Sequence, residues 1–349
     1  MKNMAMNIQQ FWSDVLEQRA DEIREYFHAG ASVNWHCSNE QFTVEEFIRA
    51  NCEYPGDWDG EIEKVVTTDD MIITATRVYP KDRSASFHVT SFIKLKDDKN
   101  EIPILEFDTE QTAVLNPTHE NLGLNLPKKC VFAFLGAYID EYASKSDTKQ
   151  VSTFESATKH YPIYITKYKG EDIVLCQAPV GAAAATQILD WLIGYGVREV
   201  ISAGSCGALE KFPESTFLVP NKALRDEGTS YHYAPPSRFV EISEKARKAI
   251  EETILEHSMK YQEVITWSTD GFFRETKEKV AYRKSEGCAV VEMECSALAA
   301  CADFRGATWG MILYTADSLA DVDKYDERNW GGNAYEYALT LCLDAVIKL

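Results

Sequence analysis

The sequence predicts two domains of different class, an α+β domain at the N-terminus and a larger α/β domain after it. Its 349 residues suit about two domains, and 45% hydrophobic with 26% charged residues is typical of globular proteins. Up to about residue 101, two helical segments precede a series of strands. From Pro103 onward, strands and helices alternate, which predicts a mixed, largely parallel sheet covered on both faces.

The first domain is expected to hold two helices followed by an antiparallel sheet. Residues 8–29 carry apolar side chains near helical spacing and predict one amphipathic helix. A short strand is expected at residues 32–36. Thr43 with Glu46 three positions later is the capping-box pattern, which predicts that the second helix begins there. Strand-like runs follow at residues 61–67, 71–79 and 84–96.

The second domain is expected to place its ligand at the carboxyl ends of its strands. The predicted strands are residues 129–134, 162–168, 172–177, 199–203, 264–268, 289–292 and 308–314. The predicted helices are residues 183–195, 242–256, 275–285, 295–304 and 333–349. Polar side chains that follow these strands are therefore the first candidates for a site.

Charge and cysteine content exclude several classes of protein. The net charge of −19 repels nucleic acid, although a small anion needs only a local positive site. The chain contains no apolar run of about 20 residues that could cross a membrane, and residues 1–10 lack a secretory signal pattern. Nine scattered cysteines without a C-x-x-C pair indicate reduced core thiols and no metal centre. A cytoplasmic protein is expected.

Two segments after predicted strands carry residues suited to binding. Ser202-Ala-Gly-Ser-Cys-Gly-Ala-Leu209 contains glycines that let a ligand approach the backbone, and its amides suit an oxyanion. Taken alone, it is equally an ordinary turn. The stretch from Ser268 to Thr276 sets Phe272 beside polar groups, where an aromatic ring could stack on a planar base or simply join the core.

Two further segments end in carboxylates. In Val291-Glu292-Met293-Glu294, the two glutamates suit a pair of sugar hydroxyls. Because a helix N-terminus also favours negative charge, one of them could be structural. The apolar run from Ile312 ends at Asp317, which could have a raised pKa and act as a general acid, or could cap a helix.

Together and in this order, these segments resemble the nucleoside phosphorylase superfamily, of the purine and uridine phosphorylase type. The resemblance covers about residues 103–349 and includes Gly-Thr-Ser-Tyr-His-Tyr-Ala-Pro at residues 228–235, which is similar to the uridine phosphorylase branch. It implies a three-layer phosphorylase/hydrolase-like α/β fold. It also implies an enzyme that cleaves the N-glycosidic bond of a nucleoside with phosphate as acceptor, and Asp317 favours a purine base over a pyrimidine.

The resemblance also implies roles for individual residues, with no metal or organic cofactor. The catalytic acid, which would protonate the purine ring, would be Asp317. The ribose would be held by Glu292, Met293 and Glu294. The base would lie against Phe272, Cys206 and Gly207. The phosphate or the attacking oxygen would face Gly136, Ser205 and Lys159.

The sequence departs from the family pattern where phosphate is usually bound. Ser202 and Asp140 occupy positions where purine phosphorylases of this type carry arginines, and Lys159 or Arg274 could compensate. Without these two guanidinium groups, the site is expected to bind phosphate more weakly. A nucleoside hydrolase similar to the methylthioadenosine/adenosylhomocysteine nucleosidases is therefore an alternative. A non-catalytic nucleoside sensor is the alternative from another class. The sequence specifies neither the base nor the sugar.

The N-terminal domain, residues 1–101, resembles the nuclear transport factor 2-like (SnoaL-like) fold over about residues 7–101. The resemblance rests on the element order and on Phe27-x-x-Gly-Ala-x-Val-x-Trp-His36. A pocket in this domain could be lined by Trp35, His36, Asp57, Trp58 and His88, or these could be structural residues. Whether the domain is a second pocket, a dimerisation module or a lid stays open. The resemblance of residues 103–349 implies a homo-oligomer.

Overall fold

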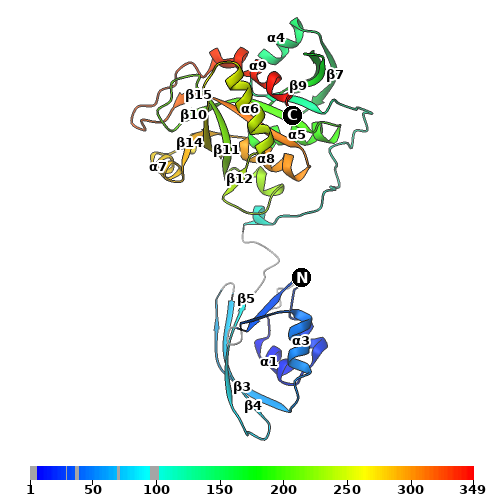
Figure 1. Cartoon of the computed structure of the whole chain (residues 1–349). Helices are drawn as coiled ribbons and strands as arrows, with labels where there is room; N and C mark the ends of the chain where they lie inside the picture. Colours follow the sequence, from blue (N-terminus) through cyan, green and yellow to red (C-terminus); the bar gives the residue numbers. More distant parts are fainter. Residues whose placement is uncertain (1–5, 29, 36–38, 69–70, 95–101) are drawn as a thin grey trace. The chain divides into compact units, whose positions relative to one another are not determined.

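The computed structural model describes residues 6–28, 30–35, 39–68, 71–94 and 102–349. The chain divides into two compact units, Met1–Lys99 and Asn100–Leu349, which we call unit 1 and unit 2 (Figure 1). The boundary expected between residues 101 and 103 lies next to this division. Among the described residues, no helix combines the length and apolarity needed to cross a membrane.

Unit 1 contains short helices and two small antiparallel sheets. Its helices are α1 (Ile8–Leu16), α2 (Ala20–Arg24) and α3 (Val44–Cys52). One sheet pairs β1 (Ser32–Trp35) with β2 (Glu40–Thr43), and the other has the order β3 (Trp58–Thr67), β4 (Met71–Pro80), β5 (Phe87–Lys94). The expected capping box is confirmed: the hydroxyl of Thr43 accepts from the amide of Glu46, whose carboxylate accepts from the amide of Thr43 at 2.8 Å.

The single helix expected over residues 8–29 is wrong, because the chain breaks between α1 and α2. Gln18 has a φ of 54°, in the left-handed region that ends a helix. Its side-chain amide donates to the carbonyl oxygens of Asn51 and Tyr54 at 2.8 Å each, which holds the break against the end of α3. The apolar spacing continued across the break because both helices bury residues, including Phe11 and Ile23, in one core.

Unit 2 is built on a single ten-stranded sheet with helices on both faces. Its strands are β6 (Lys129–Ala133), β7 (Thr148–Glu155), β8 (His160–Tyr168), β9 (Glu171–Gln177), β10 (Glu199–Ala208), β11 (Phe217–Asp226), β12 (Phe239–Glu241), β13 (Gln262–Thr269), β14 (Cys288–Glu292) and β15 (Thr308–Ser318). Its α-helices are α4 (Tyr138–Lys145), α5 (Ala182–Gly194), α6 (Glu244–Glu256), α7 (Lys277–Ser285), α8 (Cys295–Phe304) and α9 (Tyr335–Val346).

The sheet is mixed, as expected, but it is less parallel than the sequence suggested. The strand order is β12-β11-β13-β14-β10-β6-β9-β8-β7, and β15 pairs with both β10 and β11, so that β10, β14, β13, β11 and β15 form a closed ring. Among the described strands, five pairs are parallel and five antiparallel. Three of the antiparallel pairs involve β7, β11 or β12, which the sequence did not predict.

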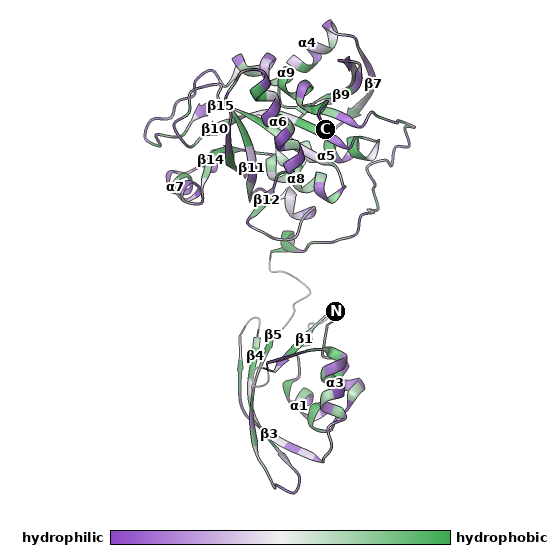
Figure 2. Ribbon diagram, viewed as in Figure 1, coloured by the Kyte–Doolittle hydropathy of each residue, from purple (hydrophilic) through white to green (hydrophobic). Residues whose placement is uncertain are grey.

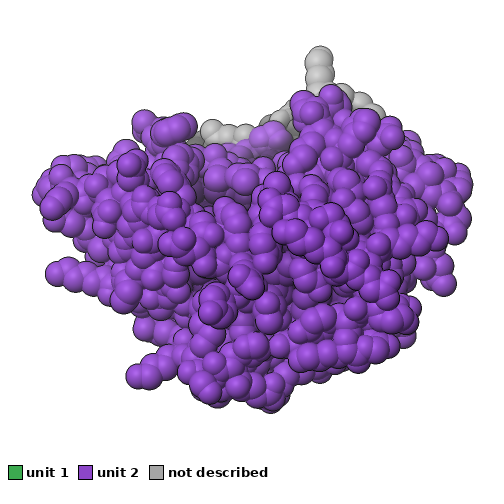
Figure 3. All heavy atoms as spheres, turned by 90° about the horizontal axis from the view of Figure 1, so that it is seen from above, with its two compact units in different colours: residues 1–99 green, residues 100–349 purple. Residues whose placement is uncertain are grey.

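Two hydrophobic cores on opposite faces of the sheet make unit 2 a three-layer structure. Along β6, Cys130 and Phe132 pack with α5 and α8, whereas Val131 and Ala133 pack with α4, α6 and α9. This alternation is what a strand buried on both faces requires. Figure 2 shows hydrophobic colours gathered on the central strands and hydrophilic colours on α7. In Figure 3, the side chains of unit 2 form a continuous packed surface.

The expected helix at residues 295–304 coincides with α8, and most other predicted elements lie within a few residues of the observed ones. Helix α4 and strands β7, β11 and β12 were not predicted. The eight described cysteines are all free, and seven of them are buried. Within the described ranges, no three His, Cys, Asp or Glu side chains are grouped so that they could hold a metal ion.

Candidate active site

A cavity of about 630 Å³ opens in unit 2 at the carboxyl ends of β6, β9, β10, β14 and β15. All ten residues that the sequence assigned to a site lie along this cavity: Gly136, Lys159, Ser205, Cys206, Gly207, Phe272, Glu292, Met293, Glu294 and Asp317. Arg274 is not among the lining residues. The structure therefore brings together segments that are separated by up to about half of the chain.

The Gly-Ser-Cys-Gly segment lies inside strand β10 and is not a turn after a strand. The strand continues to Ala208 in parallel pairing with β15, with an irregularity between Cys206 and Ala208. A Cβ on Gly207 would lie 2.9 Å from Leu319 Cδ1 and 3.3 Å from Asp317 Oδ1. The glycine therefore allows close packing beneath the cavity. Ser205, in contrast, exposes its side chain.

Glu292 is buried and fully occupied by hydrogen bonds from the protein. Its Oε1 accepts from the hydroxyls of Ser268 at 2.6 Å and Thr266 at 3.1 Å. Its Oε2 accepts from the backbone amides of Glu294 at 2.7 Å and Cys295 at 2.6 Å. Burial raises its pKa, although these four donors oppose the effect. The carboxylate thus ties β13 and β14 to the N-terminus of α8 and fixes the turn that carries Met293 and Glu294.

Glu294 is equally buried, with 6% of its surface exposed, but it has a free side. Its carboxyl group accepts from the backbone amide of Gly181, which has a φ of 100° at the start of α5, and the backbone of Met293 also acts on it. Burial and the charge of Glu292 raise the pKa of Glu294 to about 8. Glu294 lines the cavity, so its carboxyl group can accept a hydrogen bond from a ligand there.

Asp317 lies near the end of β15 and is 6% exposed. The Tyr325 hydroxyl donates to Asp317 Oδ2 at 3.1 Å. Burial raises the pKa of Asp317, while Tyr325 and the charge of Arg328 oppose the shift. A raised pKa in a shielded carboxyl group favours the role of a general acid.

Phe272 and Phe273 are not core residues, so that alternative for this segment is wrong. They lie on a 3₁₀ helix, η3 (Phe272–Arg274), and their rings contact edge to face with centroids 5.0 Å apart. Phe272 is 42% exposed and lines the cavity, whereas Phe273 is 93% exposed and does not. The geometry leaves the Phe272 ring available to a planar ligand.

Glu275, immediately after η3, also lines the cavity, and the sequence reasoning missed it. Burial and the charge of Asp317 raise the pKa of Glu275 to about 7. The segment was considered for its aromatic rings alone, although Glu275 lies only three positions after Phe272. Tyr161, Gln177, Trp330 and Tyr335 are further lining residues that no motif indicated.

The side of the cavity expected to bind phosphate has little positive charge. Lys159 is the one cation among the described lining residues; its Nζ donates to Gln177 Oε1 at 2.8 Å and lies 5.0 Å from the centre of the Tyr161 ring. Ser202 is buried and accepts from the Trp309 indole at 3.0 Å. Asp140 accepts from the Tyr164 hydroxyl at 2.9 Å. Both residues that replace the expected arginines are thus hydrogen-bonded to other residues of the protein.

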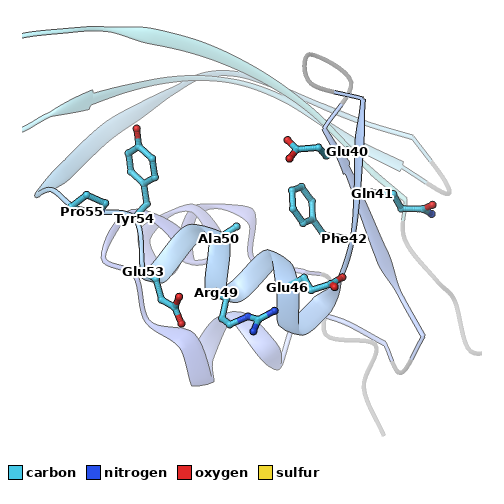
Figure 4. A pocket seen from close by; sticks show the side chains of 9 residues that line it. All are labelled: Glu40, Gln41, Phe42, Glu46, Arg49, Ala50, Glu53, Tyr54 and Pro55. Carbon is cyan, nitrogen blue, oxygen red and sulfur yellow. The ribbon is translucent and has the colours of Figure 1, made fainter.

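Unit 1 contains a shallower cavity of about 540 Å³ between α3, β2 and the segment after α3. In Figure 4, Phe42 and Tyr54 point into the space beside the sheet, whereas Arg49 and Glu53 point away from it. Two of its charged side chains are therefore turned away from a ligand in this space. The pocket candidates Trp35, Asp57, Trp58 and His88 do not line it, and His36 lies outside the described residues.

Comparisons with known proteins agree with this architecture. The family model of the phosphorylase superfamily matches residues 128–348, and the chain therefore belongs to the phosphorylase superfamily. It is 30% identical over 158 residues to a 5′-methylthioadenosine/S-adenosylhomocysteine nucleosidase of Buchnera aphidicola, covering 42% of this chain and 67% of that protein. It is 24% identical over 219 residues to a guanosine phosphorylase of Halorubrum lacusprofundi, covering 60% and 89%.

A solved structure shares the fold of unit 2. The uridine phosphorylase of Vibrio fischeri superimposes with a TM-score of 0.57 at 22% identity, covering 65% of this chain and 95% of that one. The three-layer phosphorylase fold expected from the sequence is thereby confirmed.

Proposed function

We propose that the chain cleaves the N-glycosidic bond of a purine nucleoside and transfers the sugar to phosphate. The observation that carries the proposal is the meeting, in one cavity, of a shielded acid at Asp317, an accessible ring at Phe272 and a buried carboxyl with free acceptor capacity at Glu294. These three side chains could protonate a base, stack on its ring and hydrogen-bond to its sugar, respectively.

In the proposed reaction, the base lies between the ring of Phe272 and the backbone of β10 at Gly207. Asp317 gives its proton to a ring nitrogen while the bond from the sugar to the base breaks and its electron pair passes to the base. A positioned acid contributes roughly 10²–10⁴-fold to such a step. Glu294 and Met293 hold the ribose, and Glu292 acts as a positioning residue through its hydrogen bonds to the turn.

The acceptor oxygen would approach from the side of Gly136, Ser205 and Lys159. Phosphate is the acceptor that the superfamily suggests, with Lys159 supplying the charge. Water is the second candidate, and one observation favours it. Lys159 is the one cation among the described lining residues, which also include the carboxyl groups of Glu275, Glu292, Glu294 and Asp317. A phosphate dianion gains less binding energy beside one lysine and several carboxyl groups than it would beside two arginines.

Base release from inosine, guanosine, adenosine, methylthioadenosine and uridine, each with and without phosphate, tests this proposal. Release of a purine that requires phosphate and yields a sugar 1-phosphate supports phosphorolysis. Release that ignores phosphate makes the protein a hydrolase. Ligand binding without release from any nucleoside contradicts the proposal and favours the sensor.

We propose further that unit 1 has the nuclear transport factor 2-like (SnoaL-like) fold and that the chain forms a cytoplasmic homo-oligomer without metal or organic cofactor. Support for the fold comes from the element order and from the packing of α1 on the sheet, where the Trp12 indole donates to Thr74 Oγ1 at 3.1 Å. An oligomer should give a multiple of the 39.4 kDa chain mass in light scattering at micromolar concentration. A monomer mass would exclude it.

A further inference from the structure

Glu275 is placed to contact the same ligand as Asp317, although the proposed reaction does not use it. It lies between η3, which carries Phe272, and α7, and it lines the same cavity as Phe272 and Asp317. No described residue donates a hydrogen bond to its carboxyl group or forms an ion pair with it. Asp317 and Tyr325 lie near enough to interact with Glu275 electrostatically. Its carboxyl group is partly buried and is not held by another side chain of the described residues, so it can hydrogen-bond to a ligand in the cavity.

The chemistry of purines defines what a second carboxyl group next to Asp317 would contact. On one edge of the ring, nitrogen N7 lies beside the substituent on carbon 6. In adenine this edge presents an acceptor and an amino donor, whereas in guanine it presents two acceptors, and hypoxanthine shares the 6-oxo group. Asp317, whose charge acts on Glu275 in the free protein, can donate to N7 in either case once it has taken up a proton with the bound base. The neighbouring carboxylate can accept only from the amino group, and it repels the 6-oxo oxygen.

We propose that Glu275 is a specificity-determining residue that selects 6-aminopurine nucleosides over 6-oxopurine nucleosides. The inference rests on the proposed function, since it takes the base to lie between Phe272 and Asp317. A charge-assisted hydrogen bond gained by one base and a repulsion suffered by the other together change relative affinity by roughly 10-fold to 100-fold.

The selection should depend on pH, because the protonation state of Glu275 decides whether its carboxyl group accepts a hydrogen bond from a 6-amino group or donates one to a 6-oxo group. The charged groups that act on it are Asp317 from β15 and Lys279 from α7, whose Nζ lies 2.6 Å from Asp226. The hydroxyl of Tyr325, after β15, is a further titratable group near it, and its pKa is raised to about 12. Burial and Asp317 raise its pKa to about 7. Below that pH the protonated carboxyl can donate to a 6-oxo group. Preference for the 6-amino base should therefore increase as the pH rises through about 7.

The test is calorimetric binding of free adenine and free hypoxanthine to the full chain at pH 6 and pH 8. The wild type should prefer adenine by about 10-fold or more at pH 8 and by less at pH 6. Glu275→Gln should reduce the preference at pH 8 at least several-fold and remove its pH dependence, because a glutamine amide can donate as well as accept. Glu278→Gln, on an exposed position of α7, is the matched control and should behave as wild type.

Because calorimetry measures binding and not cleavage, it distinguishes failure of this inference from failure of the proposed function. If the wild type does not prefer adenine, or if Glu275→Gln retains the wild-type preference, the inference is wrong even when nucleosides are cleaved. If adenine is preferred through Glu275 but no nucleoside is cleaved, the specificity role stands and the cleavage reaction fails. If neither base binds, both are contradicted.

Discussion

The two sides of the cavity differ in how their polar side chains are used. On the side proposed to bind the base and the sugar, Asp317 and Glu294 are buried, Glu275 is partly buried, and all three line the cavity. On the opposite side, Ser202 and Asp140 are bonded to Trp309 and Tyr164 within the protein. The comparison teaches that the residues proposed to bind and protonate the nucleoside can still accept ligand contacts, whereas the residues at the expected arginine positions are already hydrogen-bonded within the protein.

The largest effect should come from Asp317→Asn, which removes the acid but preserves shape and a hydrogen bond. Turnover should fall by roughly 10²–10⁴-fold, because the base must then leave without a proton from the protein. Nucleoside affinity, measured by calorimetry, should change little. Equal turnover in the variant and the wild type would show that the protonating group lies elsewhere.

Glu292→Gln tests whether Glu292 positions the turn that carries Met293 and Glu294 or binds the ribose directly. Placing an amide nitrogen opposite the backbone amides of Glu294 and Cys295, or opposite two hydroxyl groups, should destabilise the protein by about 2–4 kcal/mol. Denaturant unfolding measures this change, with Glu278→Gln as an exposed control. A variant as stable as the wild type but defective in ribose binding would instead make Glu292 a direct ligand.

Lys159→Met sharpens the comparison between the two sides. If phosphate is the acceptor, its KM should rise about tenfold, since a charge-assisted contact is lost, while the nucleoside KM changes little. Lys149→Met, on the neighbouring strand β7 and outside the cavity, serves as the control. A phosphate KM that does not move would mean that Lys159 plays no part in binding the acceptor.

The smallest effect should be the pH dependence of stability that Glu294 confers. Its pKa is raised from 4.5 to about 8, so the folded state holds this proton more tightly than the unfolded state does. The resulting stabilisation is complete below pH 4.5 and is lost as the pH rises through about 8. Glu294→Gln should therefore flatten this part of the profile, with a melting temperature a few degrees above wild type at pH 9. Parallel profiles would contradict the raised pKa.

The sequence predicted the α/β architecture and the residues of the cavity because each motif follows or ends a strand, and carboxyl ends of parallel strands meet at one edge. It failed where the decisive contact joins distant segments. The pKa of Glu275 is raised by burial and by the charge of Asp317, and Gly207 lies within a strand because β10 pairs there with β14 and β15. The break at Gln18 was missed because both flanking helices bury their apolar faces in one core.

The most direct test of the central claim follows the products of adenosine and phosphate by chromatography and phosphorus NMR, with the full chain at high concentration. The account predicts release of adenine with equimolar formation of a sugar 1-phosphate, and no release when phosphate is omitted. Adenine released together with free ribose, at a rate independent of phosphate, would contradict phosphorolysis and establish water as the acceptor. No release of base from adenosine or from any other purine nucleoside would contradict glycosidic cleavage itself.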